Sequence, residues 1–278
     1  MAGQPRIIKL AAAGLWRRMS ARLRTGPIAR WRFSGLTPDR VLIAPPDLRM
    51  ADAHVAQEFY SGRYALSGKT VDTGGESPFQ VMPPSEEWEA ALHNFRWLRH
   101  MREAGTGLAA AHARTLVSDW IRMHGRTIEG QTWDADTVAK RTIAWLQHSG
   151  TLLRDADLTF YRAFLRSLAY QIRYLRTVAK GLDEGEPRLR ARIALVFAAL
   201  SLPVSSTRLT QATRNLGREL ERQILPDGIH ISRNPESVLE LLTDLLPLRQ
   251  TYANQSETPP APLVAAIERL LPALRART

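Results

Sequence analysis

The chain has 278 residues, of which 44% are hydrophobic and 23% are charged, a composition typical of globular proteins. This length allows one large domain or two smaller ones. No apolar run approaches the roughly 18–20 residues of a spanning helix, which excludes that class of membrane protein. The sequence contains no cysteine, so disulfides, cysteine–zinc sites and thiolate nucleophiles are excluded as well.

The positive charge is concentrated at the start of the sequence. Lysine and arginine number 38 against 27 acidic residues, which gives a net charge of +11. Residues 1–38 contain eight basic residues and no acid, which leaves +3 for the remaining 240 residues. Such a basic arm suits nucleic acid, an anionic bilayer surface or an acidic polysaccharide; the alternative is a solvated arm that keeps the protein soluble.

This basic arm does not match a standard cleaved signal peptide. Lys9 interrupts the candidate apolar core, and Arg17 and Arg18 stand where the small residues of a cleavage site are expected. Residues 10–23 instead predict a short amphipathic helix. Contact between residues 1–38 and a membrane surface is therefore one hypothesis, and the compartment is left open.

The elements predicted directly after the arm are short. A helix is predicted over residues 51–60, and a β-hairpin over 64–71 with Ser67-Gly68 at its turn. Glycines and prolines then break the chain. The hairpin and its loop region, near 64–82, are the predicted exception to a helical chain.

From Ser85 onward apolar residues recur with the helical period, and glycine or proline separates many of the segments. The predicted helices cover residues 85–98, 106–123, 135–148, 158–175, 187–201, 206–224, 235–246 and 261–275. No fixed-period repeat is present. The sequence therefore predicts an all-α body of antiparallel helix pairs, and periodicity alone leaves both a bundle and a toroid open.

Common catalytic and cofactor-binding motifs are missing from the sequence. It has no P-loop, no dinucleotide-binding glycine motif, no Gly-x-Ser-x-Gly and no His-Glu-x-x-His. No pair among its seven histidines has the spacing and the nearby acid of a metal site. We therefore expect neither a metal nor a cofactor.

Residues 225–236 hold the densest cluster of unusual residues. Pro226-Asp227-Gly228 predicts a tight turn, and Asn234-Pro235 predicts the start of a helix. These local roles leave His230 and Arg233 unexplained, because alternation in this extended segment puts them on a polar face. An arginine and a histidine beside a turn are suited to binding a carboxylate or a sulfate.

The tryptophans form a second group of candidates, and most of them fit core positions of helices. Aromatic rings also line sugar-binding clefts. Trp97 falls off the apolar stripe formed by Trp88, Leu92 and Phe95. It is therefore the better candidate for a residue that lines such a cleft.

Three stretches carry a family resemblance. They are SGRYALSGKTVD at 61–72, PSEEWEAALHNFRWLR at 84–99 and QILPDGIHISRNP at 223–235. In this order and at this spacing they resemble the N-terminal half of the heparinase II/III-like polysaccharide lyases, in particular the α-proteobacterial members. The resemblance extends from about residue 30 to residue 275.

The resemblance implies an (α/α) toroid of paired antiparallel helices over residues 39–275. In the family a large β-sandwich follows, which would be the natural packing partner and which this sequence, ending at Thr278, does not reach. The implied reaction is β-elimination on an acidic, uronate-containing polysaccharide. A base removes the proton α to the uronate carboxylate, and an acid assists departure of the sugar.

Carried onto this sequence, the resemblance gives a set of candidate site residues. The catalytic candidates are His230 and Asn234, and the candidates for substrate binding are Arg233, His93, Trp97 and Arg63. Two departures accompany them. Glu186-Pro187 stands where family members carry an Asn-His pair, and Ser237 stands where they carry a tyrosine base. A serine needs its own activation to replace a phenol as base.

Three functions follow from these observations. The first is the toroid half of a lyase acting on acidic polysaccharide, weak or inactive as this chain alone. The second is a non-catalytic helical module that binds anionic glycan or packs against a partner. The third is binding to nucleic acid or to a membrane surface through the basic arm. The body carries no nucleic-acid motif, so nucleic acid is not the expected partner.

Overall fold

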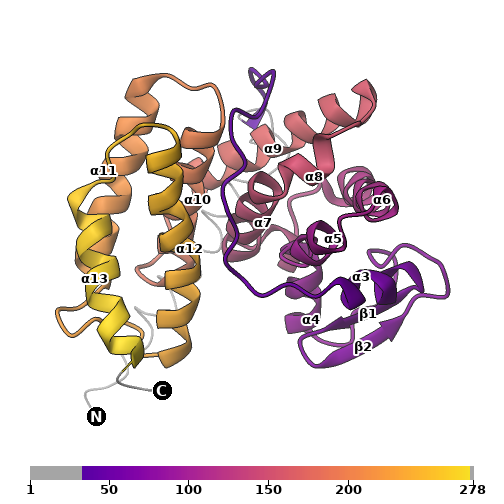
Figure 1. Ribbon diagram of the computed structural model, residues 1–278, viewed down its shortest axis with the longest axis horizontal. Helices are drawn as coiled ribbons and strands as arrows, with labels where there is room; N and C mark the ends of the chain where they lie inside the picture. Colours follow the sequence, from indigo (N-terminus) through magenta and orange to yellow (C-terminus); the bar gives the residue numbers. More distant parts are fainter. Residues whose placement is uncertain (1–32, 276–278) are drawn as a thin grey trace, which may run out of the picture. The chain divides into compact units, whose positions relative to one another are not determined.

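Helices dominate the residues that the computed structural model describes, which run from 33 to 275 (Figure 1). Eleven α-helices and one two-stranded sheet lie in that range. The all-α prediction is therefore confirmed for this part of the chain. The helix predicted over 10–23 lies outside the described residues. The unit described below begins at Thr37.

The first elements of this unit are α3 (Ala53–Tyr60), β1 (Arg63–Leu66) and β2 (Lys69–Asp72). The strands pair antiparallel with Leu66 opposite Lys69, so the predicted hairpin is confirmed. Ser67 and Gly68 have positive φ angles of 48° and 75°. A two-residue hairpin turn of this hand requires positive φ at both positions.

The chain breaks where the sequence predicts one helix over residues 85–98. α4 (Glu86–His93) ends before Asn94, and α5 (Leu98–Ala104) begins four residues later. Phe95 lies in the break with a φ of 59°, which an α-helix cannot contain. The Phe95 side chain is fully buried among other aromatic rings. Packing of this side chain therefore accompanies the end of one helix and the start of the next.

The later helices follow the predicted segments closely. They are α6 (Gly107–His124), α7 (Ala135–Gln147), α8 (Ser149–Leu153), α9 (Leu158–Val178), α10 (Glu186–Ser201), α11 (Ser206–Gln223), α12 (Pro235–Asn254) and α13 (Ala261–Arg275). α12 is longer than predicted because it continues through Pro247. Leu248 and Tyr252 beyond this proline are buried, and their burial outweighs the hydrogen bond that a proline cannot donate.

α7 and α10 form the centre of the unit and pack against each other. Most of their side chains are buried. α9 packs against α7 and α6 packs against α9, while α11 and α12 pack against α10. α13 contacts both α11 and α12, and Figure 1 shows α12 and α13 side by side. Short loops join these helices, so successive helices run antiparallel.

An extended segment, residues 37–52, links helices that are distant in sequence; we call it the strap. The amide of Leu42 donates a hydrogen bond of 2.8 Å to a carbonyl of α10. The side chain of Gln147 in α7 donates to the carbonyl of Pro46, also at 2.8 Å. Arg49 reaches α12 through an ion pair. In Figure 1 the strap passes between α12 and α5.

No helix among residues 33–275 is long and apolar enough to cross a membrane. Over the same residues, no three His, Asp or Glu side chains are grouped so that they could hold a metal ion.

Candidate functional site

A cluster of buried and half-buried ion pairs lies where the strap, α7, α10 and α12 meet. We call it the central ion cluster, and its members are Arg49, Arg96, Arg190, Asp136, Glu186, Glu240 and Asp244. Asp244 is fully buried. It accepts hydrogen bonds from three guanidinium groups: Arg49 at 2.5 Å, Arg190 at 3.3 Å and Arg96 at 3.5 Å.

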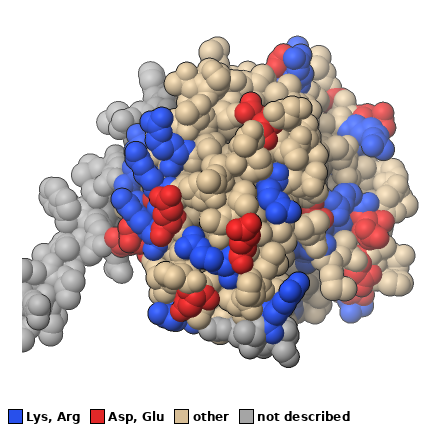
Figure 2. Space-filling model, turned by 60° about the vertical axis from the view of Figure 1, so that its left-hand side comes forward, with Lys and Arg blue, Asp and Glu red and all other residues tan. Residues whose placement is uncertain are grey.

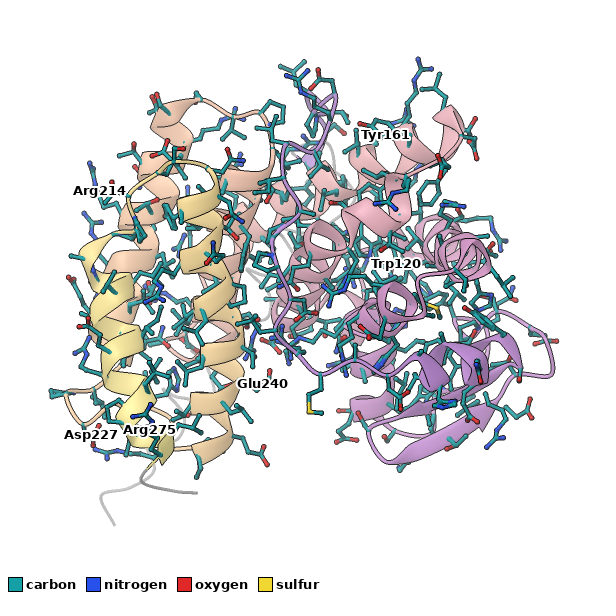
Figure 3. All side chains as sticks on the ribbon, in the orientation of Figure 1. Trp120, Tyr161, Arg214, Asp227, Glu240 and Arg275 are labelled. Carbon is teal, nitrogen blue, oxygen red and sulfur yellow. The ribbon has the colours of Figure 1, made fainter. Side chains whose placement is uncertain are left out.

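With its other carboxylates the cluster has four acidic groups for its three arginines. Glu240 accepts a hydrogen bond from Arg96 at 2.5 Å, and Figure 3 shows it on the side of α12 that faces the strap. Arg190 also pairs with Asp136 of α7 and lies 3.6 Å from Glu186, one turn earlier in α10. Each of the three arginines therefore faces at least two carboxylates of this chain.

Mutual attraction keeps these groups ionised. Burial alone would raise the pKa of Asp244, but the charges of Arg49, Arg96 and Arg190 outweigh it and hold that pKa below its ordinary value. Burial would likewise lower the pKa of Arg190, but Asp136 and Asp244 raise it instead. The cluster is therefore a set of charges that neutralise one another.

Sequence reasoning missed most of this cluster. One signal was present: Glu240 and Asp244 interrupt an apolar stretch of α12 at a spacing of four. Charged residues on the inward face of a helix need partners. Their partners Arg49 and Arg96 lie far away in sequence, and nothing in the sequence pairs them.

His230 is the centre of a second polar network, which borders on the first. It is fully buried in the extended segment before α12. Its Nδ1 accepts from the amide of Ser232 at 3.1 Å, so its Nε2 carries the proton and donates to Gln223 at 2.9 Å. Burial lowers the pKa of His230; the charge of Glu186 opposes this shift in part, and the charge of Arg190 adds to it. The imidazole is neutral, and protein groups occupy both of its nitrogens.

Ser237 and Glu186, which lie one in each of the two stretches that depart from the lyase pattern, are in direct contact. The hydroxyl of Ser237 donates a short hydrogen bond to the carboxylate of Glu186. It also lies 3.3 Å from the hydroxyl of Ser232, which contacts His230. Ser237 is buried, so its hydroxyl joins the two polar networks and does not face solvent.

Asn234 and Arg233 have local roles at the start of α12. The side chain of Asn234 caps the helix by accepting from the amide of Glu236 at 3.1 Å, as its position before Pro235 predicts. Arg233 is exposed and pairs with Asp227 at 3.1 Å. The structure thus brings the candidates His230, Arg233 and Asn234 into one loop.

His93 and Trp97 lie in a different place, the aromatic core around α4, α5 and α6. His93 is buried, and its Nδ1 accepts from the indole of Trp120 at 3.0 Å. Trp97 is only 2% exposed, and its indole donates to the carbonyl of Leu92 at 2.9 Å. Their part in a cleft stays a prediction, as does that of Arg63, which is exposed on β1 and pairs with Glu58.

The polar groups of the two networks bind one another, and this limits the chemistry that they can perform. β-Elimination needs donors that neutralise a uronate carboxylate and a base that takes the neighbouring proton. Here the guanidinium groups of the cluster face carboxylates, and the hydroxyl of Ser237 donates its proton to one. On the face that Figure 2 presents, basic side chains lie among acidic and uncharged ones.

Comparison with known proteins gives one sequence relative. FtsZ-localized protein C of Caulobacter vibrioides is 28% identical over 292 residues, a match that covers 99% of this chain and 50% of that protein. The chain therefore spans about half the length of its curated relative. No family model matches the sequence.

Two lyases are among the solved structures that share the fold. Heparinase III superposes with a TM-score of 0.67 at 15% identity, over 98% of this chain and 45% of that one. Heparan sulfate lyase HepC of Pedobacter heparinus superposes with a TM-score of 0.62 at 19% identity, over 99% and 46%. The all-α toroid fold is therefore confirmed, with the chain matching about half of each lyase.

Proposed function

We propose that this chain is a non-catalytic binding module with the toroid fold of polysaccharide lyases, in a protein that is recruited to FtsZ. The observation that carries the proposal is the central ion cluster. Its arginines, which would be the natural partners of an acidic sugar, are neutralised by Asp244, Glu240 and Asp136. A uronate would have to displace these carboxylates, of which Asp244 is fully buried, before it could bind there.

The polar network around Ser237 supports the same proposal. A catalytic base must be able to accept a proton from the substrate. The hydroxyl of Ser237 is buried and donates to Glu186, and the neutral imidazole of His230 has both nitrogens engaged. Both groups stabilise the start of α12, and neither has a free lone pair directed to solvent.

The sequence relative supports the cellular context. Identity of 28% over nearly the whole chain exceeds the 15–19% shared with the lyases. The name of that relative places it with FtsZ, and we carry this localisation to the present chain. The toroid then serves as a rigid support whose outer surface binds partners at the division site.

Two measurements test this function. In cells that carry labelled FtsZ, the fluorescently tagged chain should concentrate with FtsZ, and the tag alone should not. The purified chain should release no unsaturated uronate from heparin, heparan sulfate, alginate or hyaluronan, monitored by ultraviolet absorbance. A diffuse signal of the tagged, folded chain would overturn the recruitment, and product formation would overturn the non-catalytic role.

A second candidate function is the lyase itself, and the fold match with heparinase III favours it. In that case the longer protein, with the part that this chain lacks relative to heparinase III, should release unsaturated product. Replacement of His230 by Gln should then abolish the product while the helix content is kept. If the longer protein releases no unsaturated product from any of the four glycans, this candidate function is excluded for those substrates.

A further inference from the structure

A pocket lies between α9, α10 and α11, away from the residues of the central ion cluster and of the His230 network. Its volume is about 310 Å³. Ligand pockets typically measure about 300–1,000 Å³, so this one is the size of a small molecule or of one end of a larger one.

The floor of this pocket is apolar. Ile172 of α9, Leu195 and Ala198 of α10, and Leu202 after α10 line it, and all four are buried. Hydrocarbon placed against these side chains would be removed from water, which favours binding. The floor therefore favours an alkyl or aryl group.

The rim of the pocket is cationic. Arg176 projects from α9, Lys180 from the turn after α9, Arg192 from α10 and Arg208 from α11, and no Asp or Glu is among the lining residues. Among residues 33–275, Arg176, Lys180 and Arg208 make no ion pair, in contrast to the arginines of the central ion cluster. Cations grouped around a low-dielectric pocket raise the local concentration of anions.

Two details indicate that the rim cations are not fully compensated, although the charge of Glu219 acts on Arg192. The pKa of Arg176 lies below its ordinary value, first because of burial and second because of the charge of Arg208. The Nε of Arg192 is buried and has no acceptor among the described residues. A negatively charged oxygen near the rim would relieve the repulsion and supply an acceptor.

From this arrangement we propose that the pocket binds an anionic amphiphile: one phosphate, sulfate or carboxylate group at the rim and a short alkyl or aryl group on the floor. A hydrophilic sugar would leave the floor without a partner, and a neutral hydrocarbon would leave the rim without one. The inference is independent of the proposed function, because it uses none of the residues on which that function rests.

Isothermal titration calorimetry of the whole chain tests the proposal, with decyl phosphate below its micellar concentration as the probe. Decyl phosphate should bind at least about tenfold more tightly than either decanol or inorganic phosphate, because each of these lacks one half of the interaction. Equal affinity for decyl phosphate and decanol, or no binding of decyl phosphate, would overturn the proposal.

Matched variants locate the site. The double variant Arg176→Gln/Arg208→Gln should weaken decyl phosphate about tenfold or more. The control Arg214→Gln/Arg218→Gln removes the same charge from exposed positions of α11 that do not line the pocket, and Figure 3 shows Arg214 on the outside of that helix. It should change the affinity less than about twofold. Equal losses in the two double variants would show a non-specific charge effect and refute the site.

Two further arms complete the test. Ala212→Phe, a replacement of a lining residue of α11, fills the pocket and should weaken decyl phosphate while the circular dichroism melt stays unchanged. Vesicles with and without phosphatidylglycerol identify the source of the ligand. Binding to anionic vesicles that depends on Arg176 and Arg208 assigns a lipid, whereas binding of free decyl phosphate alone assigns a soluble ligand. Unchanged affinity in Ala212→Phe would contradict the proposed position of the tail.

Discussion

At the scale of single residues, the side chain of Asp244 connects several distant parts of the fold. It is fully buried and accepts from the guanidinium groups of Arg49, Arg96 and Arg190. Replacement by Asn keeps the shape of the side chain but removes its charge. The repulsion among the three guanidinium groups is then no longer offset by this carboxylate. Removing one partner of a buried ionic network typically costs about 3–5 kcal/mol.

We therefore predict that Asp244→Asn lowers the free energy of unfolding by about 3–5 kcal/mol, measured by urea denaturation. Asp39→Asn is the control, because Asp39 pairs with Arg40 on the surface, where both side chains are more than half exposed. Surface pairs contribute about 0–1 kcal/mol. A loss in Asp244→Asn no larger than in the control would show that the cluster does not stabilise the fold.

His93 gives the protein a pH dependence of stability. Burial, together with the charges of Arg141 and His124, lowers its pKa from 6.5 to about 2. The unfolded chain therefore takes up a proton below pH 6.5 that the folded chain does not bind. The stability contributed by the neutral imidazole is complete above that pH and is lost as pH falls.

The expected slope from this residue is about 1.4 kcal/mol per pH unit at pH values well below 6.5. In His93→Asn the side-chain oxygen can still accept from Trp120, but the group no longer titrates. The variant should be less stable at pH 7 and should lose less stability between pH 6 and pH 4, followed by urea denaturation at each pH. A pH profile parallel to that of the unchanged protein would contradict this assignment.

At the scale of elements, the turn before α12 depends on a single glycine. Gly228 has a φ of +76°, and a Cβ there would overlap the carbonyl oxygen of Arg269 in α13. Figure 3 shows the neighbouring Asp227 beside the C-terminal end of α13. The turn and the helix therefore approach each other too closely for any side chain at this position.

We predict that Gly228→Ala destabilises the protein by clearly more than Gly68→Ala, compared by thermal denaturation. Gly68 in the hairpin turn has nearly the same φ, +75°, but a Cβ there would meet nothing within 4 Å. Gly68→Ala therefore reports backbone strain alone, about 1 kcal/mol. Equal losses in the two variants would mean that α13 moves away without cost.

The helix boundaries show which features of the fold the sequence could predict. Most helix boundaries followed from periodicity and from glycine and proline, because those signals are local. The break at Phe95 did not, because tertiary packing of its ring accompanies the positive φ. That break changes the phase of the helix. The apolar stripe from which Trp97 departs in the sequence therefore ends at this break. Trp97 lies beyond the break, and its side chain is buried in the core.

The candidate site was less predictable than the fold for a related reason. The position of Asn234 before Pro235 identified the helix cap from local chemistry alone. The ion pairs of Asp244 with Arg49 and Arg96 span 195 and 148 residues. One sequence shows that such charges are buried within apolar stretches, but it does not show which distant residues neutralise them.

At the scale of the whole molecule, stability depends on the strap, because its contacts join residues that are far apart in sequence. It links α7, α10 and α12 through the contacts of Pro46, Leu42 and Arg49. A chain that begins at residue 51 lacks the strap residues that make these three contacts but keeps Asp52, which caps α3. A chain that begins at residue 37 keeps the whole strap, and both chains lack residues 1–36. The comparison therefore isolates the strap.

We predict that the chain beginning at residue 51 unfolds at a urea concentration well below that of the chain beginning at residue 37. The loss should be at least the roughly 3 kcal/mol expected for Asp244 deprived of Arg49. Hydrogen exchange should show the loss in α10 and α12 first, because the strap contacts both. Equal midpoints for the two chains would show that the helices hold together without it.

The strap also sets an order of events during synthesis. Arg49 leaves the ribosome 195 residues before its partner Asp244. At a synthesis rate of about 5–20 residues per second, Asp244 is made about 10–40 s after Arg49. The N-terminal segment is thus made early and docked late. A nascent chain stalled before α12 should expose residues 37–52 to proteases, and a chaperone that binds extended segments would find its target there.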